Sequence, residues 1–237
     1  MKARELHRWD VTPAEAREIQ LKLAHLVERQ DRLPRLRIVA GADVALEIAE
    51  PGGWRHGRGR AFAGVVVYRF PEMEEIERVS AALPLRFPYI PGLLSFREIP
   101  ALIAAFARLR QAPDLIFYDG HGYAHPRRMG IASHLGLVLD RPAIGVAKSV
   151  LIGEYREPGA RAGSSSSLID QKSGEVIGAA LRTRQGSQPV FVSLGHRISL
   201  NTAVKLTLAV SDGHRLPRPT RDADRWVGMA RRAQRLR

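Results

Sequence analysis

The sequence predicts an α/β protein with a mixed central β-sheet flanked by helices. Leu115–Tyr118 and Ala143–Ala147 are short, almost wholly apolar runs, as is typical of strands covered on both faces. Ala61–Phe70 and Glu74–Leu83 are β-rich runs separated by a proline-containing turn, which predicts a hairpin. Segments with helical patterning stand between these strands. This order favours a mixed sheet with helices on its faces.

Composition limits the possible classes of protein. The 237 residues, 45% of them hydrophobic, are enough for one sizeable domain spanning residues 1–237. Lys and Arg exceed Asp and Glu by 37 − 24 = 13, which favours a polyanionic partner, nucleic acid before an acidic membrane surface. No apolar run of about 18 residues and no signal peptide is visible, so we expect a cytoplasmic protein without a membrane partner. With no cysteine, any metal must be held by oxygen or imidazole ligands.

The first elements along the chain are a helix and a strand that carries an acid. Thr12-Pro13-Ala14-Glu15 has the form of a capping box, and it predicts a helix of about 20 residues. Arg37–Leu46 is almost continuously apolar and predicts a buried strand, interrupted by Asp43. An unpaired buried carboxylate costs several kcal/mol, so Asp43 needs a cation, a proton or hydrogen-bond donors unless it lies on an edge strand facing water.

The strand with Asp43 is followed by a Gly- and Arg-rich loop at Pro51–Arg60 and then by the hairpin. Together, these three strands predict an antiparallel meander. Phe87–Glu98 follows. Two prolines bracket Tyr89-Ile90 there and stiffen the turn, because each ring fixes φ and restricts its predecessor. Such a turn either packs its aromatic ring onto the core or projects it as a wedge between stacked bases. Ser95 is expected to cap a helix at Phe96–Leu109, with Glu98 in the first turn.

Asp119 stands where the strand Leu115–Tyr118 should end, and a carboxylate at a strand exit suggests a site. Gly120 and Gly122 allow a sharp turn there, and His121 and His125 add two imidazoles. Pro126-Arg127-Arg128 is expected to open a helix, and Met129–Leu137 to form a short buried one. The alternative is an ordinary helix-entry turn with solvated histidines.

The last third of the chain supplies basic residues and further strands. Lys148 follows the strand Ala143–Ala147, where it either extends to solvent or holds a phosphate. His214–Arg237 has eight arginines and two aspartates, a net charge of +6, and predicts a basic arm or helix along a phosphate backbone. The remaining predictions are a flexible surface loop at Gly159–Ser167, strands at Glu175–Arg182 and Val190–Leu194, and a helix from Ser199 to about Val210.

The acids predict a chemistry if they converge. Asp43, Glu98 and Asp119 come from three separate elements, and a divalent cation would relieve their mutual repulsion. All-oxygen ligands suit Mg²⁺, which keeps several waters and binds substrate phosphate directly. Such a metal favours phosphodiester hydrolysis. His125 would then position or deprotonate water, and Lys148 would stabilise the charge of the transition state.

Four motifs occur in an order that resembles the endonuclease V family. They are Phe87-Pro88-Tyr89-Ile90-Pro91-Gly92-Leu93-Leu94-Ser95-Phe96-Arg97-Glu98, Asp119-Gly120-His121-Gly122 with Ala124-His125-Pro126-Arg127-Arg128, Ile144-Gly145-Val146-Ala147-Lys148-Ser149, and Arg215-Leu216-Pro217 with Pro219-Thr220-Arg221. The resemblance runs from Leu6 to about Trp226 and implies an RNase H-like fold.

The resemblance also implies an activity. The expected enzyme is a Mg²⁺-dependent DNA repair endonuclease, with Mn²⁺ as a substitute, that recognises deoxyinosine in DNA. It cuts the second phosphodiester bond 3′ to the lesion and leaves a 3′-hydroxyl and a 5′-phosphate. Inosine-containing RNA is an alternative substrate, and a non-catalytic nucleic-acid-binding protein is the alternative from another class. We expect a monomer.

The matching positions imply residue roles. Asp43 and Asp119 hold the metal with Glu98 near them, His125 and Lys148 support the site, and Asp224 is a further acid or outer ligand. Pro88, Tyr89, Ile90 and Pro91 form the wedge that opens the strands. The pocket for the flipped hypoxanthine is formed by Gly92, Leu94, Gly120, Gly122, Gly130, Ile131 and Leu151. Two departures from the family are Arg218, where Glu is common, and the arginine-rich tail at about 226–237, expected to raise nonspecific affinity.

Overall fold

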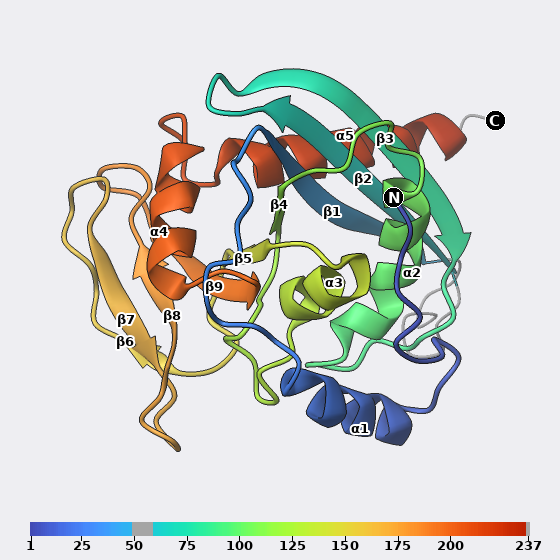
Figure 1. The fold of residues 1–237 in the computed structure, drawn as a ribbon, viewed down its shortest axis with the longest axis horizontal. Coiled ribbons are helices and arrows are strands. Elements are labelled where there is room, and N and C mark those ends of the chain that lie inside the picture. The colour runs from blue at the N-terminus through green and yellow to red at the C-terminus, as the bar shows by residue number, and fades with distance from the viewer. Residues whose placement is uncertain (49–58, 236–237) are drawn as a thin grey trace.

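The computed structural model describes residues 1–48 and 59–235 (Figure 1). Its helices are α1 (Pro13–Ala24), α2 (Leu94–Phe106), α3 (Ile131–Leu139), α4 (Leu200–Ala209) and α5 (Arg218–Arg235). Its strands are β1 (Ile38–Ile48), β2 (Gly59–Arg69), β3 (Glu74–Pro84), β4 (Leu115–Tyr118), β5 (Ala143–Ala147), β6 (Glu154–Tyr155), β7 (Ser165–Ile169), β8 (Val176–Leu181) and β9 (Val190–His196). These strands form one sheet in the order β3-β2-β1-β4-β5-β9-β8-β7-β6.

The sheet is mixed, as the sequence predicts. β1, β2 and β3 form the antiparallel meander, while β1, β4 and β5 run parallel to one another. The bounds of β4 and β5 are those expected from their apolar runs. The α/β fold with a mixed sheet flanked by helices is therefore confirmed.

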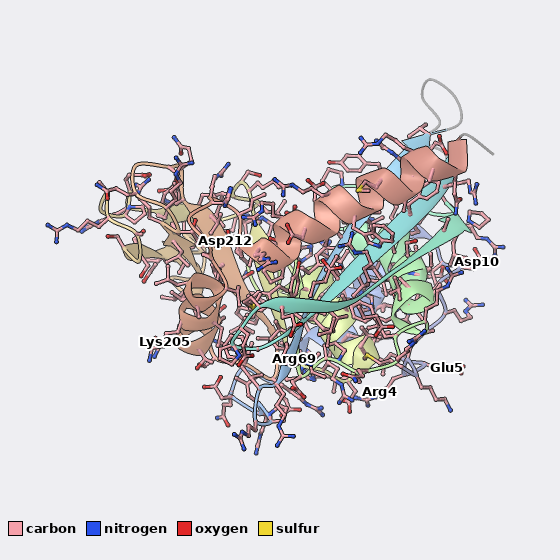
Figure 2. The ribbon with its side chains drawn as sticks, turned by 90° about the horizontal axis from the view of Figure 1, so that it is seen from above. Arg4, Glu5, Asp10, Arg69, Lys205 and Asp212 are labelled. Carbon is pink, nitrogen blue, oxygen red and sulfur yellow. The ribbon has the colours of Figure 1, made fainter. Side chains whose placement is uncertain are left out.

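Helices cover both faces of the sheet (Figure 1). Ala40 and Ala42 of β1 pack in one cluster with α2 and α3, whereas Val39, on the opposite side of the strand, packs in the other cluster. α5 lies along β1 and β2 on that second side (Figure 2). Its approach depends on Gly41, where a Cβ would lie 1.9 Å from the Pro219 carbonyl oxygen. The absent side chain lets α5 start directly beside Asp43.

Three helix predictions need correction. α1 has the expected capping box between Thr12 and Glu15 but is only 12 residues long. α2 begins at Leu94, so Ser95 lies inside the helix instead of capping it, and Glu98 lies beyond the first turn. Pro126-Arg127-Arg128 does not open a helix: Arg128 is left-handed, with φ 54°, and α3 begins only at Ile131.

Two basic or polar segments are more ordered than their composition suggests. The serines in Gly159–Ser167 belong in part to β7, which pairs with β8, so the predicted loop is wrong there. Of the tail predicted at about 226–237, residues 226–235 belong to α5, which confirms the helix alternative for this part. Val227 is 1% exposed there, and the Trp226 indole donates to the Val79 carbonyl at 2.8 Å. The loop predicted at Pro51–Arg60 lies largely outside the described residues. Within residues 1–48 and 59–235, no helix combines the length and apolarity needed to cross a membrane.

Candidate active site

Two carboxylates lie side by side on the parallel strands β1 and β4. Ala42 pairs with Tyr118, so the next residues, Asp43 and Asp119, are neighbours across the sheet. The Asp119 amide approaches the Ala42 carbonyl oxygen at 3.4 Å. β4 ends here while β1 continues, which leaves Asp119 at the sheet's carboxyl edge and Asp43 beside it. The predicted convergence of these two acids is therefore present.

A lysine and a third aspartate complete the surroundings of this pair. Lys148 follows β5, and its Nζ lies 2.5 Å from Oδ2 of Asp119. Asp224, an exposed residue of α5, raises the pKa of both Asp43 and Asp119 through its charge. Four elements, β1, β4, β5 and α5, thus contribute charged groups to one place.

Glu98 approaches from α2 and is held differently. The Tyr118 hydroxyl donates to Oε2 of Glu98 at 2.5 Å, and the glutamate is 7% exposed. Burial raises the pKa of Glu98 to about 7, although the Tyr118 hydrogen bond and the Arg97 guanidinium oppose the shift. Its carboxyl is therefore partly protonated near neutral pH.

The electrostatics of the aspartate pair show an excess of negative charge. Burial and the charge of Asp119 hold the pKa of Asp43 well above its usual range, and Glu98 and Asp224 add to the effect. The pKa of Asp119 is also raised by burial, and the Lys148 ammonium only partly offsets this. Close carboxylates with raised pKa values are a common sign of a functional site.

The donor set fits a hard divalent cation. Mg²⁺ is usually bound by one or two carboxylates together with waters and substrate phosphate, and Asp43 with Asp119 supplies such a pair. Across the part of the chain that the structure describes, no three Asp, Glu or His side chains are grouped to enclose an ion. Glu98 lies near the pair, as predicted, since its charge raises the pKa of Asp43, and its Oε2 accepts from the Tyr118 hydroxyl.

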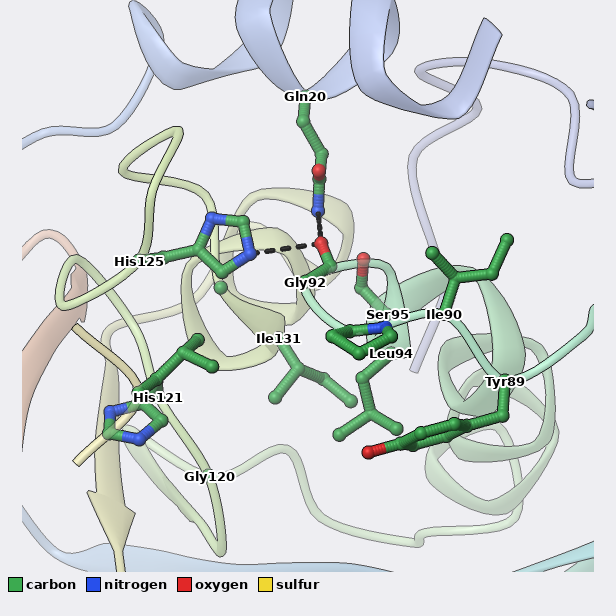
Figure 3. Close-up of a pocket in the computed structure, with 13 residues that line it drawn as sticks. Gln20, Tyr89, Ile90, Gly92, Leu94, Ser95, Gly120, His121, His125 and Ile131 are labelled. Carbon is green, nitrogen blue, oxygen red and sulfur yellow. Dashed lines mark hydrogen bonds between the residues drawn. The ribbon is translucent and has the colours of Figure 1, made fainter. Parts of the chain in front are cut away.

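A cavity of about 160 Å³ is lined by Gly120, the residue that follows Asp119 (Figure 3). Cavities of roughly 150 Å³ lined by apolar groups take up a benzene-sized ring. Six of the seven residues predicted for the base pocket line it, namely Gly92, Leu94, Gly120, Gly130, Ile131 and Leu151. Gly122 does not, because it packs against β9, where a Cβ would lie 2.1 Å from the Leu194 carbonyl oxygen.

Three of the four predicted wedge residues, Tyr89, Ile90 and Pro91, line the cavity, and Pro88 precedes them. Tyr89 is 48% exposed, and the Arg97 guanidinium lies 5.8 Å from its ring centroid. Ile90 is half-buried and packs against a small apolar cluster that includes Phe87 and Leu93. The turn therefore presents Tyr89 outward while both of its ends are anchored.

His125 lies in the cavity wall and not among the acids. Its Nε2 contacts the Gly92 carbonyl oxygen at 2.9 Å, and its Nδ1 accepts from the Arg127 amide at 3.2 Å. Burial and the nearby Arg127 lower the pKa of His125 to about 4, so the ring is neutral. Both ring nitrogens are engaged, which corrects the expectation that His125 positions or deprotonates a water.

Sequence reasoning did not assign three further residues to the cavity, Gln20, Ser95 and His121. Within the described chain, the Ser95 hydroxyl and His121 Nδ1 are buried without a hydrogen-bond partner. Gln20 had a usable signal, since it shares the buried face of α1 with Ala16 and Leu23. A polar residue in the middle of an apolar helix face needs partners, and that requirement marks it as structural or functional.

The fold and these neighbouring features define an α/β enzyme with a carboxylate site next to a ring-sized cavity. A family model described as endonuclease V matches residues 21–225. An endonuclease V from Gloeobacter violaceus is 47% identical, covering 97% of this chain and 90% of that protein. The Bacillus subtilis endonuclease V structure superposes with a TM-score of 0.90 at 30% identity, covering 99% of each chain. The Ciona intestinalis endonuclease V, 29% identical with a TM-score of 0.80 over 93% of this chain and 98% of that one, was solved with DNA containing an inosine followed by a ribo-adenosine. This chain belongs to the endonuclease V family, whose members are nucleases.

Proposed function

We propose that this protein is a DNA repair endonuclease that recognises deoxyinosine and hydrolyses the second phosphodiester bond on its 3′ side, leaving a 3′-hydroxyl and a 5′-phosphate. The observation that carries the proposal is the adjacency of a ring-sized cavity and a pair of charge-crowded aspartates. A flipped base in the cavity would bring its own strand to the acids, because Gly120 lines the cavity and follows Asp119 directly.

Asp43 and Asp119 would hold Mg²⁺, with Mn²⁺ as a substitute. The bound metal supplies Lewis-acid activation of the phosphate and of an attacking water. Lys148, already next to Asp119, would offset charge that develops on the phosphate. Glu98, with a pKa of about 7, would hold or release a proton at the edge of the site, and Asp224 would act as an outer acid.

The wedge and the cavity would divide the work of recognition. The turn Pro88–Pro91 would insert Tyr89 and Ile90 between stacked bases. Their contacts with the bases would offset part of the free-energy cost of unstacking the lesion. The cavity would then receive the planar base against Leu94, Ile131 and the glycines. The Ciona relative, bound to inosine-containing DNA, supports this class of ligand.

Inosine-containing RNA is a second candidate substrate. The cavity would contact the base and would not discriminate between ribose and deoxyribose. The DNA bound by the Ciona relative also carries a ribonucleotide after its inosine. A 2′-hydroxyl is the group that distinguishes the two substrates.

The test is a denaturing-gel map of a 5′-labelled duplex with one deoxyinosine, incubated with the protein and Mg²⁺. An undamaged duplex, the same sequence as inosine-containing RNA, and an Asp43→Ala variant serve as comparisons. We expect one Mg²⁺-dependent cut at the second bond 3′ of the lesion, absent from the undamaged duplex and from the variant. Cleavage of RNA alone would reassign the substrate, and lesion-selective binding without any cut would support the non-catalytic alternative.

A further inference from the structure

The buried carboxamide of Gln20 joins three separate segments around the cavity. Gln20 is 1% exposed on α1. Its Nε2 donates to the Gly92 carbonyl oxygen at 3.0 Å (Figure 3). The same Nε2 donates to the Met129 carbonyl oxygen at 3.1 Å, and Oε1 accepts from Arg127 Nε at 2.7 Å. One side chain therefore connects α1 to the end of the wedge turn and to the loop before α3.

Gly92 is the residue through which the wedge is held. It follows Pro91 directly and has φ +78°, a conformation that other residues rarely adopt. Its carbonyl oxygen is contacted by Gln20 Nε2, Arg127 Nη2 at 2.9 Å and His125 Nε2 at 2.9 Å. Three donors on one partly buried oxygen fix the direction in which the turn leaves the wedge.

The same face of α1 also packs against the base of the wedge. Ala16, one turn before Gln20, is fully buried in a cluster with Phe87 and Leu93, which precede and follow the wedge residues. α1 therefore supports the turn by apolar contact at both ends and by a hydrogen bond at Gly92. We propose that Gln20 is a positioning residue that holds the wedge rigid for opening a duplex and is not needed for hydrolysis itself.

This inference rests on the proposed function and has a specific consequence. Opening a stacked duplex costs a few kcal/mol, and a turn that yields under that load would not transmit it. A single-stranded substrate needs no opening. Loss of the clamp should therefore weaken action on duplex inosine far more than action on unpaired inosine.

The experiment uses Gln20→Met, which keeps the side-chain length and removes all three hydrogen bonds. Single-turnover cleavage with excess enzyme is measured on one deoxyinosine oligonucleotide, single-stranded and in duplex. We expect the duplex rate to fall about tenfold, the effect of losing roughly one buried hydrogen bond's net free energy, and the single-strand rate to stay within about twofold. Lys22→Met, at an exposed position on the same helix, is the matched control and should leave both rates unchanged.

A second readout does not require cleavage. A 2-aminopurine next to the inosine brightens when the wild-type protein unstacks it, and Gln20→Met should bind without this change. Arg127→Met, which removes two contacts of the same clamp, should show the same preference for single strands and serves if Gln20→Met does not fold.

Equal losses on both substrates would overturn the inference and make Gln20 a direct contact of the base. An unchanged duplex rate would overturn it as well. If the wild-type protein cuts neither substrate, the proposed function fails, and the 2-aminopurine comparison still decides the role of Gln20.

Discussion

Gly120 lies between the cavity and the acid pair, and the two regions differ in how far their polar and charged groups are compensated by the fold. Around the cavity, the Gly92 carbonyl is met by three donors, and His125 is neutral because burial lowers its pKa to about 4. At the acid pair, burial and repulsion raise the pKa of both Asp43 and Asp119, and Lys148 offsets only part of this. The contacts within the fold thus account for the shape of the cavity, whereas the acid pair keeps an excess of negative charge that the proposed Mg²⁺ would offset.

The largest expected effect comes from relieving the acid pair. Asp43→Asn should reduce cleavage about a thousandfold, roughly 4 kcal/mol of transition-state stabilisation, because one of the two proposed metal ligands is lost. Without metal, the same variant should be about 1–2 kcal/mol more stable, since a repelling buried charge is gone. Single-turnover cleavage and metal-free urea unfolding measure the two changes. Parallel loss of activity and stability would refute the idea that the pair is destabilising.

Substitutions of two glycines should distinguish a residue needed for stability, Gly122, from one that shapes the cavity, Gly120. Gly122→Ala should destabilise the protein by about 2–4 kcal/mol, because the new Cβ meets the Leu194 carbonyl oxygen at 2.1 Å. Gly120→Ala meets the Ile131 Cγ2 at 3.0 Å, a side chain that can shift, and should cost about 1 kcal/mol while narrowing the cavity. Thermal unfolding and inosine-DNA binding are measured for both. Equal stability losses would contradict this distinction.

The free energy of unfolding should depend on pH because the pKa of Glu98 is raised in the folded protein. The pKa of Glu98 is raised from 4.5 to about 7 in the folded protein, so proton binding favours folding. Its stabilising contribution is fully present below pH 4.5 and is lost as the pH rises through about 7. Glu98→Gln should remove about 1–3 kcal/mol of this dependence, measured by metal-free urea unfolding between pH 4.5 and 8. Superimposable profiles of variant and wild type would rule this out.

Truncating the Tyr89 side chain tests whether the wedge is needed to open a duplex. Tyr89→Ala should slow cleavage of duplex inosine about tenfold, since an inserted aromatic ring is worth about 1–3 kcal/mol of stacking. Cleavage of single-stranded inosine should change little. Tyr155→Ala, on β6 and away from the cavity, is the control. A similar loss on both strand states would place Tyr89 in base binding instead.

The smallest expected effect lies at the start of α1. Thr12→Ala removes the side chain that accepts from the Glu15 amide at 3.3 Å, and it should cost about 1 kcal/mol. Because α1 carries Gln20, the duplex rate should fall slightly more than the single-strand rate. Thermal unfolding with both cleavage assays measures this. Thr202→Ala, on α4, should lower stability without affecting the ratio of the two rates.

Much of the fold follows from local patterns in the sequence. The apolar runs of β4 and β5 and the capping box of α1 define their elements because each depends on neighbouring residues alone. The serine-rich β7 was missed because its strand character comes from pairing with β8, which composition does not encode. The α2 start was missed because Leu93, its N-cap residue, makes no side-chain cap.

Part of the site could likewise be predicted from local sequence patterns, and the rest depends on contacts between distant segments. Asp43 and Asp119 stand out as acids in apolar strands, and the register of β1 with β4 makes them neighbours. The role of His125 was missed, because only the folded chain brings Gly92 and Arg127 to its two ring nitrogens. Gln20 was missed because its three partners lie 72 to 109 residues away along the chain.

The position of α5 has a consequence for how the protein is made. α5 lies over Gly41 next to Asp43, yet it is synthesised after every strand of the sheet. A chain synthesised only as far as β9 therefore lacks both Asp224 and the Pro219 carbonyl that lies against Gly41. The order of synthesis therefore delays assembly of the complete carboxylate site until every strand of the sheet has been made.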